Sequence, residues 1–180
     1  MNTRVFASKI NNYLFLFFTA AFAGFLWEIL LCYITSKEFC NRGFFYGPWL
    51  PVYGSGAVLI YFFLHRKSQY PVRCFCYSAF IGAVVELFTG WLLNTLFGLR
   101  YWDYSDEFLN LGGYVCLYSV IGFALAGTAY VCFAAPFLLK HWQRLSVRIR
   151  RNCIGFLLVL AAIDIAASLI FPNKGRGITF

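Results

Sequence analysis

Two carboxylates stand inside long apolar stretches of this chain, each within nearly the same short phrase. Residues 21–29 read A-F-x-G-x-x-x-E-I and residues 79–87 read A-F-x-G-x-x-x-E-L, so Glu28 and Glu86 occupy matching positions 58 residues apart. A third acid, Asp164, lies in a later apolar stretch. An ionisable side chain inside a membrane is costly unless it is paired, and such residues commonly mark ion, proton or substrate pathways.

Two loop sequences rich in aromatic residues and glycine follow these acids, and each contains an arginine, Arg42 or Arg100, in the same register. We expect each arginine to pair with its glutamate or to hold a substrate anion. Clustered Gly and Pro at 47–56 indicate a backbone that re-enters toward the carboxylates. The other candidates for this polar pocket are Tyr46, Tyr53, Trp102, Asp103, Tyr104, Asn110 and Tyr118, with Asp164 as a secondary candidate.

The composition is that of a multi-pass membrane protein. Of 180 residues, 61% are hydrophobic, 22% aromatic and 12% charged, whereas soluble domains are about 45–50% apolar and about 25% charged. A membrane-spanning helix needs about 20 apolar residues. The sequence therefore predicts an all-helical, single-domain bundle of about five helices, near residues 10–34, 49–64, 74–97, 111–139 and 153–171.

Lysine and arginine residues indicate the orientation of these helices. Ten of them fall on one predicted side and five on the other, and the more basic side is expected to be cytoplasmic. The N-terminus is then inside the cell and the C-terminus outside. The first apolar stretch is too long for a cleavable signal peptide, so we expect it to remain as a helix. The ten are Arg4, Lys9, Arg66, Lys67, Arg73, Lys140, Arg144, Arg148, Arg150 and Arg151.

The recurring phrase predicts a helical hairpin used twice, at about 9–64 and 67–139, with a fifth helix at about 153–171. Repeats with an even number of spans are related by an axis along the membrane normal. Small residues at i, i+4 spacing lie on the same faces as both glutamates, as they do at helix contacts in membranes. The acids are therefore either a functional site between the hairpins or purely structural partners of neighbouring side chains.

Other classes of site are not indicated by the sequence. Seven scattered cysteines do not form a disulfide framework and are interpreted as small buried hydrophobic residues. No metal-ligand cluster, nucleophile motif or G-x-x-x-x-G-K-[ST] phosphate loop is present, so we expect no cofactor, no metal and no enzyme activity. The net charge of +8 is assigned to topology and membrane lipid rather than to nucleic acid.

Several segments resemble one known family. They are Trp27-Glu28, N-R-G-F-F-Y-G-P-W-L-P-V-Y-G-S-G at 41–56, V-E-L-F-T-G at 85–90, L-R-Y-W-D-Y-S at 99–105 and F-L-N-L-G-G-Y-V-C-L-Y-S at 108–119. Over about residues 20–125 the chain is similar to the putative ABC-transporter type IV family of CmpB-like membrane proteins. Gly113 and Tyr114 stand where that family usually has a polar or basic residue. The resemblance implies a multi-pass protein of the bacterial cell membrane that is a component of a transporter.

Three functions remain open at this point. The first is a transporter or permease subunit with an outward-facing polar site between the hairpins. The second is a non-catalytic assembly or regulatory subunit, and the third is a membrane-embedded enzyme acting on a lipid-linked substrate. An ATP-driven process would require a separate ATPase, for which the basic segment 140–151 is the expected docking surface. A homo-oligomer is also compatible with the sequence.

Overall fold

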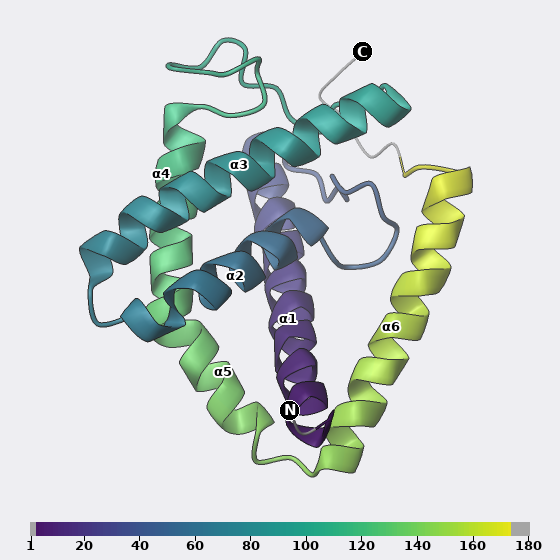
Figure 1. Ribbon diagram of the computed structural model, residues 1–180. Helices are drawn as coiled ribbons and strands as arrows, with labels where there is room; N and C mark the ends of the chain where they lie inside the picture. The colour runs from purple at the N-terminus through teal and green to yellow at the C-terminus, as the bar shows by residue number, and fades with distance from the viewer. Residues whose placement is uncertain (1–2, 174–180) are drawn as a thin grey trace.

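The computed structural model describes residues 3–173, with side chains described from Ser8, and over this part of the chain it consists of helices and loops (Figure 1). Arg4, Lys174 and Arg176, which were counted for the orientation, have side chains outside the described set. A 3₁₀ turn, His65–Lys67, follows α2, and a π-helical segment, Tyr130–Ala134, joins α4 to α5. The α-helices are α1 (Thr3–Ser36), α2 (Pro51–Leu64), α3 (Pro71–Phe97), α4 (Leu117–Ala129), α5 (Ala135–Trp142) and α6 (Val147–Ile170).

Within the described residues, four helical segments are long and apolar enough to cross a membrane: Ser8–Ser36, Pro71–Phe97, Leu117–Trp142 and Val147–Ile170. The helical membrane bundle is therefore confirmed. The predicted second span, 49–64, is different, because α2 has only 14 residues. At 1.5 Å per residue this helix is about 21 Å long, which is shorter than a hydrocarbon core of about 30 Å.

A non-helical first loop, residues 37–50, leads into the short helix α2. It leaves the end of α1 and returns to the middle of the same helix, where the amide of Leu50 donates to the carbonyl of Ala21 at 3.1 Å. Ala21 lies 15 residues before the helix ends, about 22 Å along its axis. Figure 1 shows this loop folded between α2 and α6. Such backbone is tolerated at membrane depth when protein covers it.

The prediction that no disulfide forms is wrong for one pair of cysteines. Cys32, near the end of α1, is bonded to Cys40 in the first loop, with their Cα atoms 6.4 Å apart. The disulfide ties the start of the loop to the helix that it has just left. Cys74 and Cys116 are free and buried, as predicted, and Cys76 and Cys153 are free and exposed.

The helices pack as two consecutive hairpins. Helix α1 packs against α2 and α3 packs against α4, while contacts between α2 and α3 join the two pairs. Helix α6 stands apart from the hairpins and contacts α1 (Figure 1). These pairs coincide with the proposed repeat units at 9–64 and 67–139, although the duplication itself stays a prediction.

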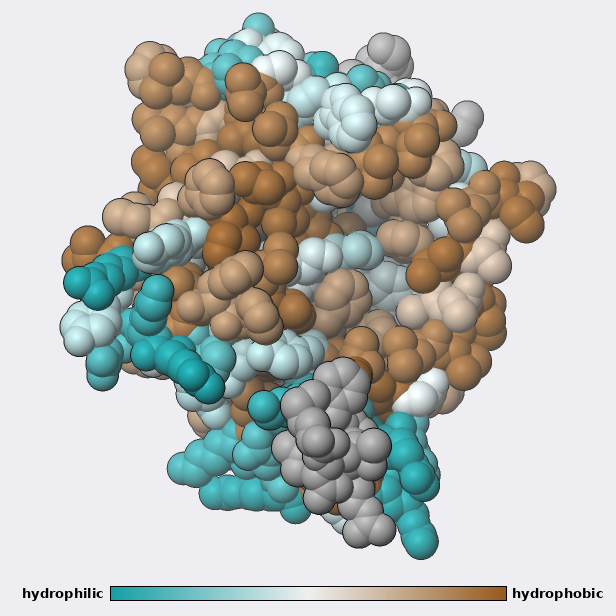
Figure 2. Space-filling model, viewed as in Figure 1, coloured by the Kyte–Doolittle hydropathy of each residue, from teal (hydrophilic) through white to brown (hydrophobic). Residues whose placement is uncertain are grey.

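Hydrophobic side chains cover much of the surface between two more polar ends (Figure 2). Phe62, Phe80, Phe133 and Phe156 are examples, each more than half exposed. A large exposed apolar surface is normal for a protein whose surroundings are lipid chains, because those chains are as apolar as the side chains.

Close packing within the first hairpin depends on Gly54. A Cβ atom on this residue would lie 2.9 Å from the carbonyl oxygen of Phe17, whereas a Cβ on Gly56 would meet nothing within 4 Å. We predict that Gly54→Ala lowers the free energy of unfolding by about 1–3 kcal/mol, as overpacking does. Gly56→Ala should leave it unchanged or raise it, because alanine favours helix. Thermal unfolding in detergent measures both, and equal melting temperatures would contradict the packing of α1 on α2.

The disulfide predicts a specific count of reactive thiols. In unreduced, unfolded protein a maleimide reagent should label five cysteines, and all seven after reduction, because only Cys32 and Cys40 are bonded. The matched variant Cys40→Ser should give six labels with or without reduction. Mass shifts of the labelled protein report the count. Seven labels on unreduced wild-type protein would contradict the bond.

Candidate functional site

Glu86 lies on the face of α3 that packs against α4, and its carboxylate is bound by two hydroxyl groups. Tyr104 donates to Oε1 at 3.1 Å and Ser119 donates to Oε2 at 2.8 Å. Ser119 also accepts a hydrogen bond from the amide of Cys116 at the start of α4. Only 4% of Glu86 is exposed. The helix, the third loop (residues 98–116) and the first turn of α4 therefore build this carboxylate site together.

Glu28 has a similar partner in the first hairpin. The hydroxyl of Tyr53 donates to its Oε1 at 2.6 Å. Tyr53 is the third residue of α2, just as Ser119 is the third residue of α4. In both hairpins a hydroxyl from the first turn of the returning helix thus reaches the glutamate of the outgoing helix. A Cβ atom on Gly24 would overlap the Tyr53 ring, so a glycine is required one turn before Glu28.

The two glutamates lie in the same region of the bundle rather than at separate helix contacts. Tyr53 is close enough to interact electrostatically with both Glu28 and Glu86, and the two carboxylates also interact with each other. The Tyr53 ring packs against Phe123 of α4, with ring centroids 5.5 Å apart. Aromatic rings from the two hairpins therefore contact each other beside Glu28.

The predicted pairing of these glutamates with arginine is not what the structure shows. Arg100 forms an ion pair with Asp103 at 3.2 Å and donates to the carbonyl of Gly112 at 2.6 Å. Its guanidinium also lies over the Tyr114 ring, 4.8 Å from the centroid. Arg42 is half-buried and its Nε has no hydrogen-bond partner among the described residues. Over the described part of the chain, neither Glu28 nor Glu86 is paired with a lysine or arginine side chain.

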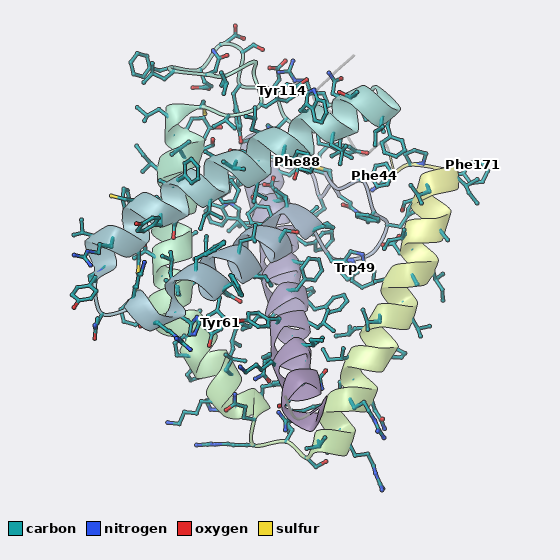
Figure 3. The ribbon with its side chains drawn as sticks, in the orientation of Figure 1. Phe44, Trp49, Tyr61, Phe88, Tyr114 and Phe171 are labelled. Carbon is teal, nitrogen blue, oxygen red and sulfur yellow. A yellow bond between two sulfur atoms is a disulfide. The ribbon has the colours of Figure 1, made fainter. Side chains whose placement is uncertain are left out.

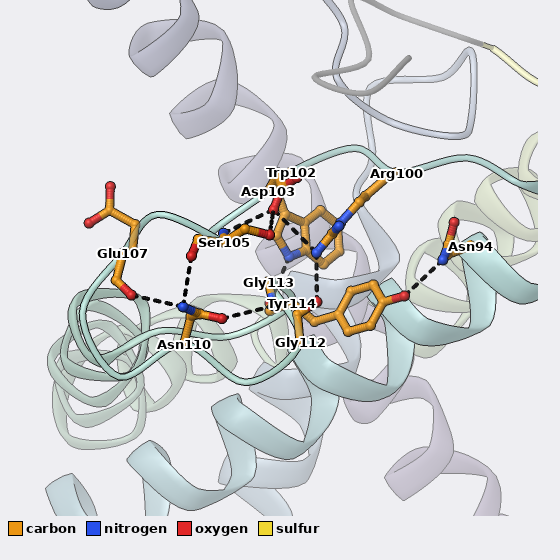
Figure 4. A network of polar contacts seen from close by, with 10 residues as sticks. All are labelled: Asn94, Arg100, Trp102, Asp103, Ser105, Glu107, Asn110, Gly112, Gly113 and Tyr114. Atoms are coloured by element: carbon orange, nitrogen blue, oxygen red, sulfur yellow. Dashed lines mark hydrogen bonds and ion pairs between the residues drawn. The ribbon is translucent and has the colours of Figure 1, made fainter.

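Side chains and backbone of the third loop form a network of hydrogen bonds (Figure 4). The indole of Trp102 donates to the carbonyl of Tyr114, and the hydroxyl of Tyr114 accepts from Asn94 of α3. The side-chain amide of Asn110 donates to the carbonyls of Ser105 and Glu107, and its oxygen accepts from the amide of Gly113. These contacts give Trp102 and Asn110 structural positions in the loop.

Asp103 and Tyr104 have different electrostatic surroundings within this loop. The hydroxyl and amide of Ser105 both donate to Asp103, and with Arg100 nearby they hold the pKa of that carboxyl below its usual range. Burial, followed by the charge of Glu86, raises the pKa of Tyr104 far above its usual value. Asp103 therefore stays ionised and Tyr104 stays a neutral donor at physiological pH. The ring of Tyr118, itself 56% exposed, packs edge-on against Tyr104.

Asp164 on α6 holds the first loop. Its carboxylate accepts from the backbone amides of Tyr46 and Gly47, both at 3.0 Å, and from the indole of Trp49 at 2.8 Å. Ser168 adds a longer hydrogen bond of 3.3 Å from one turn further along the helix. Figure 3 shows Trp49 beside α6. Tyr46 contributes its backbone here, and 55% of the residue is exposed.

The structure thus brings Glu28, Glu86, Tyr53, Tyr104 and Tyr118 into one region and places Asp164 in a separate anchor. Sequence reasoning missed the roles of Ser119, Trp49 and Ser168. In the sequence, Ser119 is one of several small residues on a helix face. Its position in the first turn of α4 was a usable signal, because serine there binds backbone amides and neighbouring acids. Among the described residues no group of three or more His, Cys, Asp or Glu side chains is arranged to hold a metal ion.

A family model described as putative ABC-transporter type IV matches residues 15–169, which is most of the chain. The chain belongs to this family, and it is a multi-pass, transporter-like membrane protein. No curated protein matches it. No solved structure matches it either.

The Asp164 anchor predicts a large effect of a small substitution. Asp164→Asn replaces one accepting oxygen by an NH₂ group that faces amide and indole donors, which leaves buried donors unpaired. We expect the free energy of unfolding to fall by about 1–3 kcal/mol and the first loop to become sensitive to protease. Asp106→Asn, an exposed acid in the third loop, is the matched control and should change neither. Unchanged melting temperature and proteolysis in Asp164→Asn would contradict the anchor.

Proposed function

We propose that this protein is a transport component whose intramembrane site binds a proton or a small monovalent cation at Glu28 and Glu86. The observation that carries the proposal is the absence, among the described residues, of any basic side chain paired with either carboxylate. An ionised carboxylate in a low-dielectric interior needs a positive charge nearby or takes up a proton. Because the described residues supply hydroxyl donors instead, we propose that the positive charge is a proton or cation taken up from solution.

The hydroxyl groups at this site are suited to the binding and release of a proton or cation. Tyr53, Tyr104 and Ser119 can donate to an ionised carboxylate, and each can turn its hydroxyl to accept from a protonated one. Replacing a hydroxyl bond costs little compared with breaking a buried ion pair. The site can therefore be occupied and emptied without dismantling the helix contacts that form it.

We further propose that this site opens toward the extracytoplasmic side. The charge asymmetry of the sequence puts the basic segments in the cytoplasm. The Cys32–Cys40 disulfide supports the same orientation, since disulfides persist in oxidising compartments. The first and third loops then face outward, and the chain between α5 and α6 faces the cytoplasm.

For a process driven by ATP, the proposed docking surface of a separate ATPase is the segment 140–151. Lys140, Arg144, Arg148 and Arg151 are all exposed there. Between Glu107 and Asp164 the chain contains no acidic residue, so this surface would attract a partner with an acidic face.

The carboxylate site is tested by neutralising both acids. In proteoliposomes with an imposed proton or sodium gradient, wild-type protein should take up the ion, and Glu28→Gln, Glu86→Gln should reduce uptake to the background of empty vesicles. The amide side chains keep the hydrogen bonds to hydroxyl groups while removing the charge, so the melting temperature should stay close to that of wild type. Glu107→Gln, an exposed acid in the third loop, is the control and should keep full uptake.

A second candidate function, a non-catalytic assembly subunit, is favoured by the fact that every carboxylate at this site already has a protein donor. It predicts a different result. Wild-type uptake by the double variant would overturn the transport site. If the double variant also failed to purify with a partner subunit that wild-type protein retains, the assembly role would replace it.

A further inference from the structure

The corner where α1, α5 and α6 meet contains three buried polar atoms that have no hydrogen-bond partner among the described residues. They are Oδ1 of Asn12, Nε1 of Trp142 and Nε of Arg150. Trp142 is only 6% exposed, so water does not satisfy its indole N–H from the surface. A buried polar group left unpaired costs about 1–3 kcal/mol. Three such groups on three helices are therefore candidates for hydrogen bonds to a ligand.

Packing and helix spacing put the three residues on helix faces that turn toward one another. The Trp142 ring stacks on Phe15 of α1, with ring centroids 4.2 Å apart. Leu16, Trp142 and Ile154 of α6 belong to one buried cluster. Asn12 precedes Leu16 by one helical turn, and Arg150 precedes Ile154 by one turn, so both lie on the faces turned toward Trp142.

The electrostatics of this corner favour an anion. Five basic residues fall between Lys140 and Arg151, and no acid lies between Glu107 and Asp164 to balance them. Helix α6 also begins here, and the hydroxyl of Ser146 accepts a hydrogen bond from the amide of Ile149. The first amides of a helix point out of its N-terminal end. The N-terminus of a 24-residue helix attracts negative charge through its dipole and its free N–H groups.

We propose that this corner binds the phosphate group of an anionic phospholipid. The guanidinium of Arg150 and the indole N–H of Trp142 donate to phosphate oxygens, and Asn12 hydrogen-bonds to the headgroup. The phosphate enters beside the Arg150 side chain, which turns to meet it. A lipid is favoured over a free anion because exposed apolar residues surround the cations: Leu145, Val147 and Ile149 are 41%, 69% and 48% exposed. Apolar and basic side chains alternate in this way at the headgroup level of a membrane.

Two neighbouring arginines distinguish a specific lipid-binding site from general attraction of lipid to a basic surface. Arg150 is half-buried with an unpaired Nε, whereas its neighbour Arg151 is exposed. Arg150→Gln and Arg151→Gln remove the same charge one residue apart. Trp142→Phe removes the indole N–H and keeps an aromatic ring to stack on Phe15.

The test measures retention of phosphatidylglycerol by the full-length protein, with native mass spectrometry of detergent micelles at a series of lipid concentrations. A hydrogen bond to a charged group contributes about 1.5–3 kcal/mol, so Arg150→Gln should weaken binding about tenfold or more. Trp142→Phe should weaken it by roughly threefold to tenfold, since a single donor is lost. Arg151→Gln should stay within about threefold of wild type. Melting temperatures measured alongside show whether each variant remains folded.

Two further arms identify the ligand. Phosphatidylcholine should bind more weakly than phosphatidylglycerol, because its headgroup has no net charge, and inorganic phosphate in large excess should leave the bound phosphatidylglycerol in place. Equal losses for Arg150→Gln and Arg151→Gln would overturn the proposal in favour of diffuse attraction. Displacement by inorganic phosphate would overturn the lipid assignment, and an unfolded Trp142→Phe variant would leave the arginine pair as the deciding comparison.

Discussion

The hydrogen bonds that Asp164 accepts from the first loop are the contact on which the rest of the arrangement depends. They hold Tyr46, Gly47 and Trp49 against the C-terminal third of α6, and the chain then reaches the middle of α1 at Ala21. Helix α2 begins directly after that point. Its start position decides where Tyr53 lies, and Tyr53 is the partner of Glu28. A carboxylate on the last helix thereby positions a hydroxyl in the first hairpin.

The three intramembrane acids differ in what satisfies them. Asp164 accepts hydrogen bonds from two backbone amides and an indole, which are donors fixed in place by the fold. Glu28 and Glu86 accept hydroxyl groups, which rotate and can reverse their role from donor to acceptor. An acidic residue inside the membrane thus serves as a structural anchor where its donors are rigid. Where the donors can rotate, as at Glu28 and Glu86, the arrangement supports the proposed binding of a proton or a cation.

The fold could be predicted from the sequence largely because apolar length is such a direct signal. The short second segment and its non-helical start followed from Gly47, Pro48 and Pro51. The pairing of charges could not be predicted, because Arg100 has Asp103 only three residues away, and a local partner in a loop outcompetes a distant glutamate inside the bundle. The Cys32–Cys40 bond was missed for a related reason. Cys32 lies before the end of α1 and Cys40 lies after it. The spacing of the two cysteines in the sequence does not show how the chain turns between them.

Basic and acidic side chains of this protein lie in different parts of the bundle. Basic side chains around α5 and α6 lie where phosphate groups of lipid can compensate them. The glutamates are not paired with any basic side chain of the described residues. If the cations had been placed beside Glu28 and Glu86, the bundle would have gained ion pairs that are costly to break. Keeping the two signs apart is what the proposed exchange of a mobile charge at the carboxylates and the proposed binding of lipid at the basic end both require.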